Sequence, residues 1–320
     1  SGIAGEAMLR ADSVQEQRNL LQVGRKNLII NGGFDVWQRG TAGVAENGFN
    51  MDAADRWYAV RGALSKEIEN SVTYCHMVHG NYADSCYINH RVEDFAHTLG
   101  KQVTISYKIK SDDGLGADGG IFIRYYNSSN TYTTPLTSRT YVYGSDWTTI
   151  TYTFTMPATT PKDGYGLEIF LYGDLNSVNN NGKSFDIKEV QLELGSVATD
   201  FEHRSFGEEF ALCQRYYQRT YNYGTATGTA TTDGALLHSM DGTQSYGKLY
   251  WQFKTSMRSN PTIVSYNTNN GTAGQLSADA LNHATGFLLV GQSGAGIGVG
   301  GISIGTSTYL KAHATADAEL

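Results

Sequence analysis

Several short patterns contain residue types that bind phosphates or catalyse reactions, but none has the spacing or the flanking elements that such chemistry needs. Residues 296–301 read GIGVGG and satisfy the G-x-G-x-x-G pattern of dinucleotide-binding loops. That pattern requires a strand before it and a helix after it, whereas here Gly-rich, β-like sequence flanks it. Residues 291–295 read GQSGA and lack the final glycine of a nucleophile elbow. The sequence therefore indicates neither a nucleotide site nor a serine nucleophile.

The histidines, cysteines and carboxylates give no clear signal for a metal centre or for acid-base catalysis. No His-x-x-x-His or Cys-x-x-Cys spacing occurs, and neighbouring histidines differ in strand parity, so we expect packed or surface histidines. A glycosidase needs two carboxylates at a set separation, and we expect the available ones to be solvated or in turns. The histidines are His76, His79, His90 and His97, and the acids are Glu168, Asp174, Glu189 and Glu193.

Charge and hydropathy argue against two classes of partner. The 320 residues have a net charge of −7 and no basic patch, which disfavours a nucleic-acid partner. The longest apolar run near the C-terminus, residues 287–290, is far too short for membrane insertion. Three cysteines are too few for a disulfide framework and fit folding in a reducing cytoplasm. The start at Ser1, without methionine or a signal-peptide pattern, indicates a processed or truncated N-terminus.

The elements that must position any site are β-strands. The chain contains 21 Tyr, 12 Phe, 4 Trp and 37 Gly; aromatic residues suit pleated, half-buried surfaces, and glycine supplies turns. From residue 27 onward apolar and polar residues alternate with period two, and a slip near Lys188 and Glu189 predicts a β-bulge. Predicted strands cover residues 72–79, 82–91, 103–109, 121–126, 150–156, 167–172 and 184–194, then 249–253, 262–266, 286–290, 302–304 and 308–314.

Two cysteines lie symmetrically about a predicted turn. If residues 72–79 and 82–91 form a hairpin at Gly80 and Asn81, Cys75 and Cys86 would be directly opposed across it. A disulfide is geometrically conceivable at that position. We favour two packed free thiols, because the cysteine usage indicates a reducing compartment.

Two predicted helices divide the chain. Residues 4–23 read as a helix with one narrow apolar seam, which fits either a short parallel coiled-coil stalk or a helix packed on its own domain. Ser205 and Glu208 match a capping box that opens a second helix, and the low-complexity run 224–232 indicates a loop after it. The predicted order is an N-terminal helix in 1–26, a β-sandwich in 27–204, a connecting helix in 205–220 and a second, smaller β-sandwich in 221–320.

Four motifs stand out from this generic pattern. They are NLIINGGFDVWQRG at residues 27–40, ADRW at 54–57, VQLELGSVATDFEHR at 190–204 and EEFALCQRYY at 208–217. Together they resemble the opening and the closing of a module common in bacteriophage tail-fibre proteins. That module is similar to carbohydrate-binding jelly rolls. The resemblance therefore implies an all-β fold with a jelly-roll sandwich in the first domain.

The resemblance also has implications for individual residues. Relatives of the jelly-roll fold bind a structural calcium where the first strand meets the last, and Asp35 and Asp186 are the side chains best placed to supply its oxygen ligands. We expect no other cofactor. The remaining motif residues have a structural role in this interpretation: Trp37 and Trp57 fill the core, and Arg39, Asp55 and Arg56 hold turns through charge-assisted hydrogen bonds.

The implied function is host attachment without catalysis. A phage fibre of this kind would be a homotrimer, joined to other virion proteins through its N-terminus, whose weak glycan sites gain avidity together. It would be assembled in the bacterial cytoplasm and reside in the virion. Sugars are recognised by aromatic faces and by amide or hydroxyl side chains. The candidate residues are Tyr125, Tyr126, Asn127, Tyr132 and Tyr172 in the first domain and Tyr246, Tyr250, Tyr266 and Tyr309 in the second.

Two other functions fit part of the sequence. A virion decoration or connector, such as a head fibre, would use both sandwiches as spacers and trimer contacts. A polysaccharide depolymerase would resemble a long parallel β-helix, and no solenoid repeat is visible. For an attachment protein we expect host recognition mainly in residues 221–320, because this distal domain carries Gly-, Ser-, Thr- and Asn-rich connections at 267–274 and 291–301.

Overall fold

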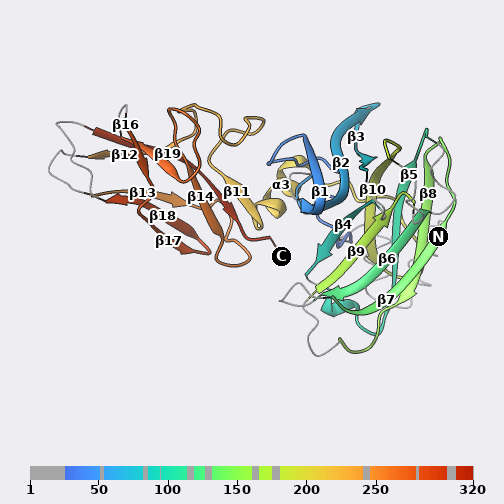
Figure 1. The fold of residues 1–320 in the computed structure, drawn as a ribbon. Helices are drawn as coiled ribbons and strands as arrows, with labels where there is room; N and C mark the ends of the chain where they lie inside the picture. Colours follow the sequence, from blue (N-terminus) through green and yellow to red (C-terminus); the bar gives the residue numbers. More distant parts are fainter. Residues whose placement is uncertain are drawn as a thin grey trace, which may run out of the picture. The chain divides into compact units, whose positions relative to one another are not determined.

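The chain is nearly all β, as predicted, and it divides into two compact units (Figure 1). In the described residues, no helix is long and apolar enough to cross a membrane. The predicted helix at residues 4–23 and the predicted strand at 302–304 lie outside the described residues. The computed structural model describes residues 26–50, 54–81, 86–93, 95–113, 119–126, 132–160, 166–174, 181–240, 246–278, 281–300 and 308–319, without the side chains of 44–50, 132–134, 240, 246, 287, 300 and 308.

The division into units differs from the predicted domain boundaries. The first unit contains the described residues up to Asp35 and those of Ala42–Ser205, and the second contains Val36–Thr41 and the residues from Phe206 onward. Part of the opening motif therefore belongs to the second unit. There, Gln38 Nε2 donates to the Tyr217 carbonyl at 3.0 Å. Such a long-range contact leaves no mark in the local sequence.

The first unit is built from strands that form one hydrogen-bonded sheet. Its order is β7-β6-β9-β4-β2-β3-β10-β5-β8, with β1 paired to β2, and a short 3-10 helix at Ala96–Thr98 precedes β5. The strands are β1 Ala42–Asn50, β2 Trp57–Glu69, β3 Val72–His79, β4 Tyr87–Val92, β5 Gln102–Lys110, β6 Gly119–Tyr126, β7 Tyr132–Tyr141, β8 Thr148–Thr155, β9 Gly166–Tyr172 and β10 Ser184–Leu194.

The long strand β2 folds this sheet into two layers. Residues 57–60 pair with β4, whereas residues 62–69 pair with β3. Between them Arg61 has a φ of 60°, in the left-handed region, so the strand turns there. The two edge strands of the sheet approach each other, since the hydroxyls of Thr137 in β7 and Tyr152 in β8 are hydrogen-bonded. The core between the layers includes Ile88, Ile123, Ile169, Leu171, Met77, Ile105, Ile109 and Ile187.

The opening and closing motifs of the first unit lie against each other. Asn27 Nδ2 donates to the carbonyl of Val190 at 3.0 Å, and its Oδ1 accepts from the amide of Leu192 at 3.1 Å. Arg204 donates to the Ile29 carbonyl at 3.2 Å. The two motifs therefore occur together because each satisfies the backbone groups of the other.

Three predictions for the first unit can be compared with the structure. The bulge is confirmed, since Glu189 has a φ of 55° and the register against β5 shifts between Lys188 and Gln191. The hairpin of residues 72–79 and 82–91 is wrong, because β3 and β4 each pair with one half of β2 instead of with each other. Cys75 and Cys86 are buried free thiols, and burial raises the pKa of both.

The second unit has one central strand. β19 pairs with β11 and β12 on one edge and with β14 and β15 on the other, while β13, β18 and β17 form a separate sheet. The elements are α3 Phe206–Gln214, β11 Tyr217–Arg219, β12 Leu236–Met240, β13 Tyr246–Gln252, β14 Thr262–Tyr266, β15 Gln275–Ala278, β16 Leu281–Ala284, β17 Phe287–Gly291, β18 Gly294–Gly300 and β19 Thr308–Asp317.

Two predictions for this unit need correction. The helix begins directly after Ser205, as predicted, but it ends at Gln214 and the following residues enter β11. Residues 291–301 are not an adaptable loop, since most of them form β18, which pairs with β13 and β17. The high glycine content of this segment suggested a loop. In the structure the glycines occupy every second position of β18, and the residues between them, such as Ile297 and Val299, point into the core.

His313 of β19 is buried beneath the segment that follows β11. Its ring stacks on Tyr221 with 3.8 Å between the centroids. Nε2 lies 3.1 Å from the carbonyl oxygen of Thr231, which can only accept, so Nε2 carries the proton. Nδ1 accepts from the hydroxyl of Thr220 at 2.9 Å. Burial lowers the pKa of His313, which favours this neutral form.

We predict that Trp57→Ala lowers the free energy of unfolding by about 3–5 kcal/mol. Trp57 is buried, its Nε1 donates to the Asn31 carbonyl at 2.9 Å, and its ring lies 4.8 Å from that of Phe34. Denaturant melting measures the loss. Val142→Ala, at an exposed position, is the control and should change stability by no more than about 0.5 kcal/mol. An unchanged melting curve for Trp57→Ala would contradict its role in the core.

We predict that the contributions of His90 and His313 to stability fall as the pH drops below about 6.5, the ordinary histidine pKa. Burial lowers the folded-state pKa of His90 and of His313. Between its folded and unfolded pKa values, each of these histidines binds more protons in the unfolded chain, so its contribution to the free energy of unfolding rises with pH and levels off above the unfolded value. Denaturant melts across this range should show a smaller pH dependence for His313→Gln. His238→Gln, at a partly exposed position of β12, is the control. Parallel curves for wild type and His313→Gln would refute the assignment.

Candidate functional site

One face of the layer formed by β2, β4, β9 and β6 carries aromatic, amide and charged side chains. Directly paired residues of antiparallel strands point to the same face, so the register places these side chains in rows. The opposite face of the same strands points into the core. We call the first surface the aromatic face. Its rows are Tyr87 and Tyr172; Tyr58, Asn89, Phe170 and Phe122; and Arg91, Glu168 and Arg124.

The aromatic rings form a connected platform around Phe170. The Phe170 ring is buried, and the centroids of Tyr87 and Phe122 lie 5.2 Å and 5.5 Å from it. Tyr172 stacks on it at 6.3 Å. The rings of Tyr87, Phe122 and Tyr172 are each partly exposed. Burial raises the pKa of the Tyr172 hydroxyl, which stays protonated at neutral pH. The platform therefore offers solvent three apolar rings with fixed positions.

The charged row is held together by Glu168, which is completely buried. Its Oε1 accepts from Arg91 Nε at 3.1 Å, and its Oε2 accepts from Arg124 Nε at 2.7 Å. The Arg124 guanidinium carbon lies 4.4 Å from the Phe170 centroid, within cation-π distance. Two guanidinium groups around one carboxylate leave a net positive charge in this row. The row also fixes the rotamers next to the aromatic platform.

Asn89 lies between the aromatic platform and the charged row. Its Nδ2 donates to Glu168 Oε1 at 2.7 Å, whereas its Oδ1 is buried and has no hydrogen-bond partner among the described residues. A buried acceptor without a partner costs about 1–3 kcal/mol. The arrangement is suited to a ligand with an apolar face and many hydroxyls.

The structure separates the candidate residues of the first domain. Tyr172 lies on the aromatic face, and the Tyr126 ring lies 4.9 Å from the Arg91 guanidinium carbon. Tyr125 points to the other face, where it is buried against Phe95, so it is not part of this surface. Tyr125 and Tyr126 were both chosen because they are tyrosines, but adjacent residues of a strand point to opposite faces. Asn127 and the side chain of Tyr132 lie outside the described residues.

The candidates of the second domain lie on separate strands. Tyr250 of β13 is 72 % exposed, and Lys248 Nζ lies 4.9 Å from its ring centroid. Tyr266 of β14 packs at 6.0 Å on Tyr221. Tyr309 of β19 is 46 % exposed. The side chain of Tyr246 lies outside the described residues. The three described tyrosines thus belong to two different sheets, and no single surface is defined by them.

Asp35 and Asp186, the predicted calcium ligands, have basic neighbours. Asp186 Oδ1 lies 2.6 Å from His76 Nδ1, a hydrogen bond that raises the pKa of His76. Lys110 Nζ is 3.7 Å from Asp186, and Lys66 Nζ donates to the backbone oxygen of Asp35 at 2.9 Å. Calcium takes oxygen ligands, and the described residues contain no group of three or more His, Cys, Asp or Glu side chains suited to a metal. These surroundings fit ion pairs better than calcium, and calcium binding stays a prediction.

The sequence reasoning missed most of the aromatic face. It expected Glu168 and Glu193 to be solvated or in turns, and this is wrong, because both are buried in strands with hydrogen-bonded carboxylates. A usable signal was present in the period-two spacing. Polar or aromatic residues recur at every second position along two predicted strands. These positions are Tyr87, Asn89 and Arg91 on one strand and Glu168, Phe170 and Tyr172 on the other.

Comparisons with known proteins give remote structural likenesses. No family model and no curated protein matches the sequence. A structure described as "CBM4 structure and function" is 17 % identical with a TM-score of 0.36, covering 52 % of this chain and 98 % of its own. The CBM22-1 xylan-binding domain of Paenibacillus barcinonensis Xyn10C is 12 % identical with a TM-score of 0.33, covering 44 % and 87 %.

A third solved structure is the enzymatically active domain of tailspike protein 4 from bacteriophage CBA120. It is 11 % identical with a TM-score of 0.36, and the match covers 53 % of this chain. The chain spans only about a fifth of that structure, 21 % of its length. At TM-scores below 0.5 these likenesses assign neither a ligand nor an activity to this chain.

We predict that Glu168→Gln lowers the free energy of unfolding by about 3–5 kcal/mol, because it removes the charge that compensates the buried Arg91 and the partly buried Arg124. Denaturant melting measures the change. Glu189→Gln is the matched control, since Glu189 pairs with the partly exposed Lys108 at 2.7 Å. Its loss should be about 0–1 kcal/mol. If the two variants melt alike, Glu168 does not organise the charged row.

Proposed function

We propose that this protein binds cell-surface glycans through the aromatic face of its first unit, as a trimeric fibre protein of a bacteriophage virion, without catalysis. One observation carries the proposal. The partly exposed rings of Tyr87, Phe122 and Tyr172 lie around the buried Phe170, and the partly exposed Arg124 has its guanidinium carbon 4.4 Å from that ring. Apolar faces combined with a few fixed polar groups are what a sugar site requires.

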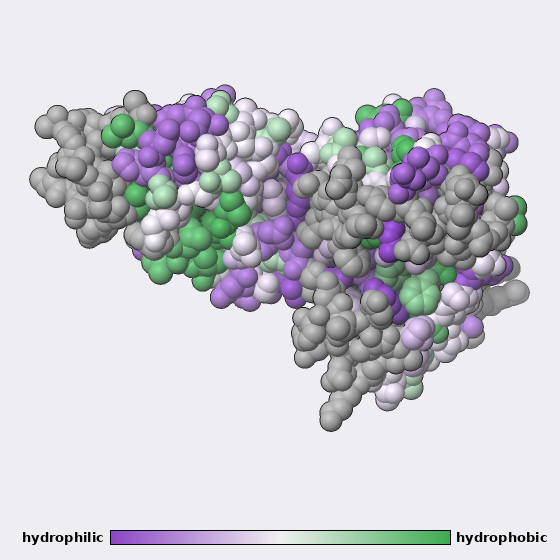
Figure 2. Space-filling model, in the orientation of Figure 1, coloured by the Kyte–Doolittle hydropathy of each residue, from purple (hydrophilic) through white to green (hydrophobic). Residues whose placement is uncertain are grey.

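The chemistry of a sugar ring matches this surface. Its C–H face can pack on Phe122 or Tyr172. The guanidinium of Arg124, partly accessible at the edge of the platform, can donate to a ring or hydroxyl oxygen. In Figure 2, hydrophobic and hydrophilic residues lie next to one another over β4, β9 and β6. Each contact is weak, so binding to a host surface would depend on several copies acting together.

The surroundings of Glu168 support binding without catalysis. A general acid in a glycosidase must reach the glycosidic oxygen and exchange a proton. Glu168 is completely buried and accepts hydrogen bonds from Asn89, Arg91 and Arg124. Both carboxylate oxygens therefore accept hydrogen bonds from neighbouring side chains of the aromatic face and are not available to a substrate.

The fibre and trimer parts of the proposal rest on other observations. The motifs at 27–40 and 190–204 resemble those of tail-fibre proteins. Exposed apolar residues suit a subunit interface. Leu288 and Leu289 of β17 are 41 % and 55 % exposed, and Figure 2 shows a hydrophobic patch on the second unit. In this proposal the N-terminal part joins other virion proteins, and assembly takes place in the bacterial cytoplasm.

We predict that Phe122→Ala and Tyr172→Ala each weaken binding to a host glycan about tenfold, the effect expected from losing a stacking ring and its buried area. A glycan array on the full chain identifies the ligand, and titration measures its Kd. Tyr250→Ala, an exposed tyrosine of the second unit, is the matched control and should bind as the wild type does. Light scattering on all samples checks that they contain the same number of chains, three in the proposed assembly.

Three other outcomes would each contradict a part of this proposal. A trimer that binds no glycan would favour a virion connector. A larger loss for Tyr250→Ala than for the first-unit variants would move recognition into residues 221–320, as the sequence suggests for a distal domain. Release of oligosaccharides from host polysaccharide would contradict binding without catalysis.

A further inference from the structure

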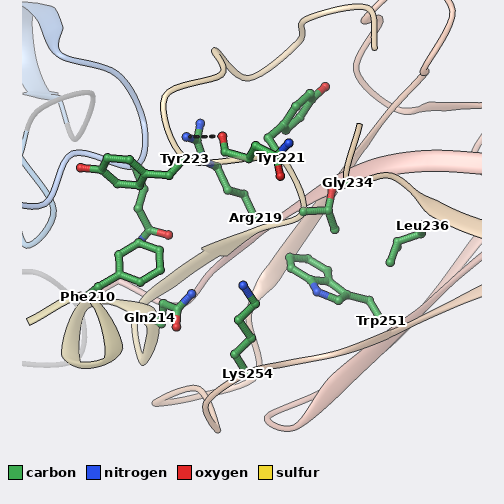
Figure 3. Close-up of a pocket in the computed structure, with 12 residues that line it drawn as sticks. Phe210, Gln214, Arg219, Tyr221, Tyr223, Gly234, Leu236, Trp251 and Lys254 are labelled. Atoms are coloured by element: carbon green, nitrogen blue, oxygen red, sulfur yellow. Dashed lines mark hydrogen bonds between the residues drawn. The ribbon is translucent and has the colours of Figure 1, made fainter. Parts of the chain in front are cut away.

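The second unit contains a cavity of about 390 Å³ that is separate from the aromatic face. It lies among α3, β11, the segment after β11, β12 and β13, and Figure 3 shows its lining side chains. Its size falls within the range of about 300–1,000 Å³ that is usual for small-molecule sites. Phe210 and Leu236 supply apolar wall, whereas Gln214, Arg219, Trp251 and Lys254 supply polar groups.

The charge of the lining has one sign. Arg219 and Lys254 line the cavity, and none of its lining residues is an aspartate or glutamate. This contrasts with the chain as a whole, whose net charge is −7. Arg219 is oriented by the loop above it, since its guanidinium donates to the carbonyls of Thr225 at 2.7 Å and Asn222 at 3.2 Å. The Lys254 side chain extends into the cavity beside Trp251 (Figure 3).

Two buried polar side chains of the lining have no hydrogen-bond partner among the described residues. Gln214 is 7 % exposed and Trp251 is 8 % exposed. Neither the Gln214 carboxamide nor the Trp251 indole N–H bonds to any described residue. Both side chains line the cavity instead (Figure 3). Both groups can therefore donate to an acceptor bound in the cavity.

We propose that this cavity binds a carboxylate-bearing sugar residue. The Lys254 ammonium would pair with the carboxylate, and the Gln214 carboxamide and the Trp251 N–H would donate to its oxygens or to ring hydroxyls. Phe210 and Leu236 would contact the C–H groups of the sugar. The site goes beyond the proposed glycan face, because it lies in the other unit and selects for negative charge. The protein would thus read two features of an acidic polysaccharide at independent sites.

The test uses the full chain and three probes: glucuronate, glucose and acetate. Calorimetric titration should show glucuronate binding at least about tenfold tighter than glucose or acetate, because a hydrogen bond to a charged group contributes more than one to a neutral group. Lys254→Gln should weaken glucuronate binding at least about tenfold and leave glucose binding unchanged. Lys248→Gln removes the same charge from β13 outside the cavity and should have no effect.

A second variant tests the indole donor. Trp251→Phe keeps an aromatic ring but removes the N–H, so glucuronate affinity should fall several-fold, and thermal melting checks that the variant is folded at the titration temperature. Glucose binding as tightly as glucuronate would overturn the charge selection, and acetate binding as tightly would overturn the sugar. No glucuronate binding, or equal losses for Lys254→Gln and Lys248→Gln, would overturn the site. Phe122→Ala, which tests the aromatic face, should leave glucuronate binding in the cavity unchanged, so the two proposals can fail separately.

Discussion

β2 sets the architecture of the first unit, because its two halves hydrogen-bond to strands of different layers. The change of partner occurs at Arg61, whose left-handed backbone is unfavourable for a residue with a Cβ by about 1–3 kcal/mol. The next residue is Gly62, where an added Cβ would lie 2.5 Å from the Val78 carbonyl and 2.7 Å from Cys86 Sγ. The two layers therefore meet at Gly62, where there is no room for a side chain. The hydrogen bonds that β2 makes with β1, β3 and β4 offset the local strain. The position of both layers therefore depends on this turn.

The aromatic face depends on this geometry. β4 is held by β2 on one edge and by β9 on the other, so residues at alternate positions of β4 have fixed directions. Ile88 points into the core, while Asn89 points to the opposite face. The ion cluster around Glu168 adds orientation more than stability, since buried charges lose most of their attraction to desolvation. A surface of this kind is rigid before any ligand arrives, which lowers the entropy cost of binding.

Sequence patterns gave the class of fold and most strands, because period-two alternation reflects burial on one side of a strand. The bulge near Lys188 was visible as a slip of that alternation. Pairing partners were not visible: the symmetric spacing of Cys75 and Cys86 suggested a hairpin, although β2 separates their strands. The site was predicted by residue type, which mixed Tyr125 and Tyr126 although they face opposite directions. Gln214 and Trp251 come from distant segments, and their common cavity follows only from tertiary packing.

β19 joins four other strands of the second unit, and it is the last of them to be synthesised. Ribosomes add roughly 5–20 residues each second, so the strands from β11 to β15 emerge several seconds before their common partner. During this interval their edges are open to pairing with other chains. In the first unit, β3 and β5 likewise wait for their common partner β10, which ends at Leu194. All strands of the first unit have therefore been synthesised before β19, whereas the second unit can complete its sheet only after residues 308–317 have emerged. Where several ribosomes translate one message, neighbouring nascent chains could pair through these open edges before β19 is made. Slower synthesis would lengthen the interval.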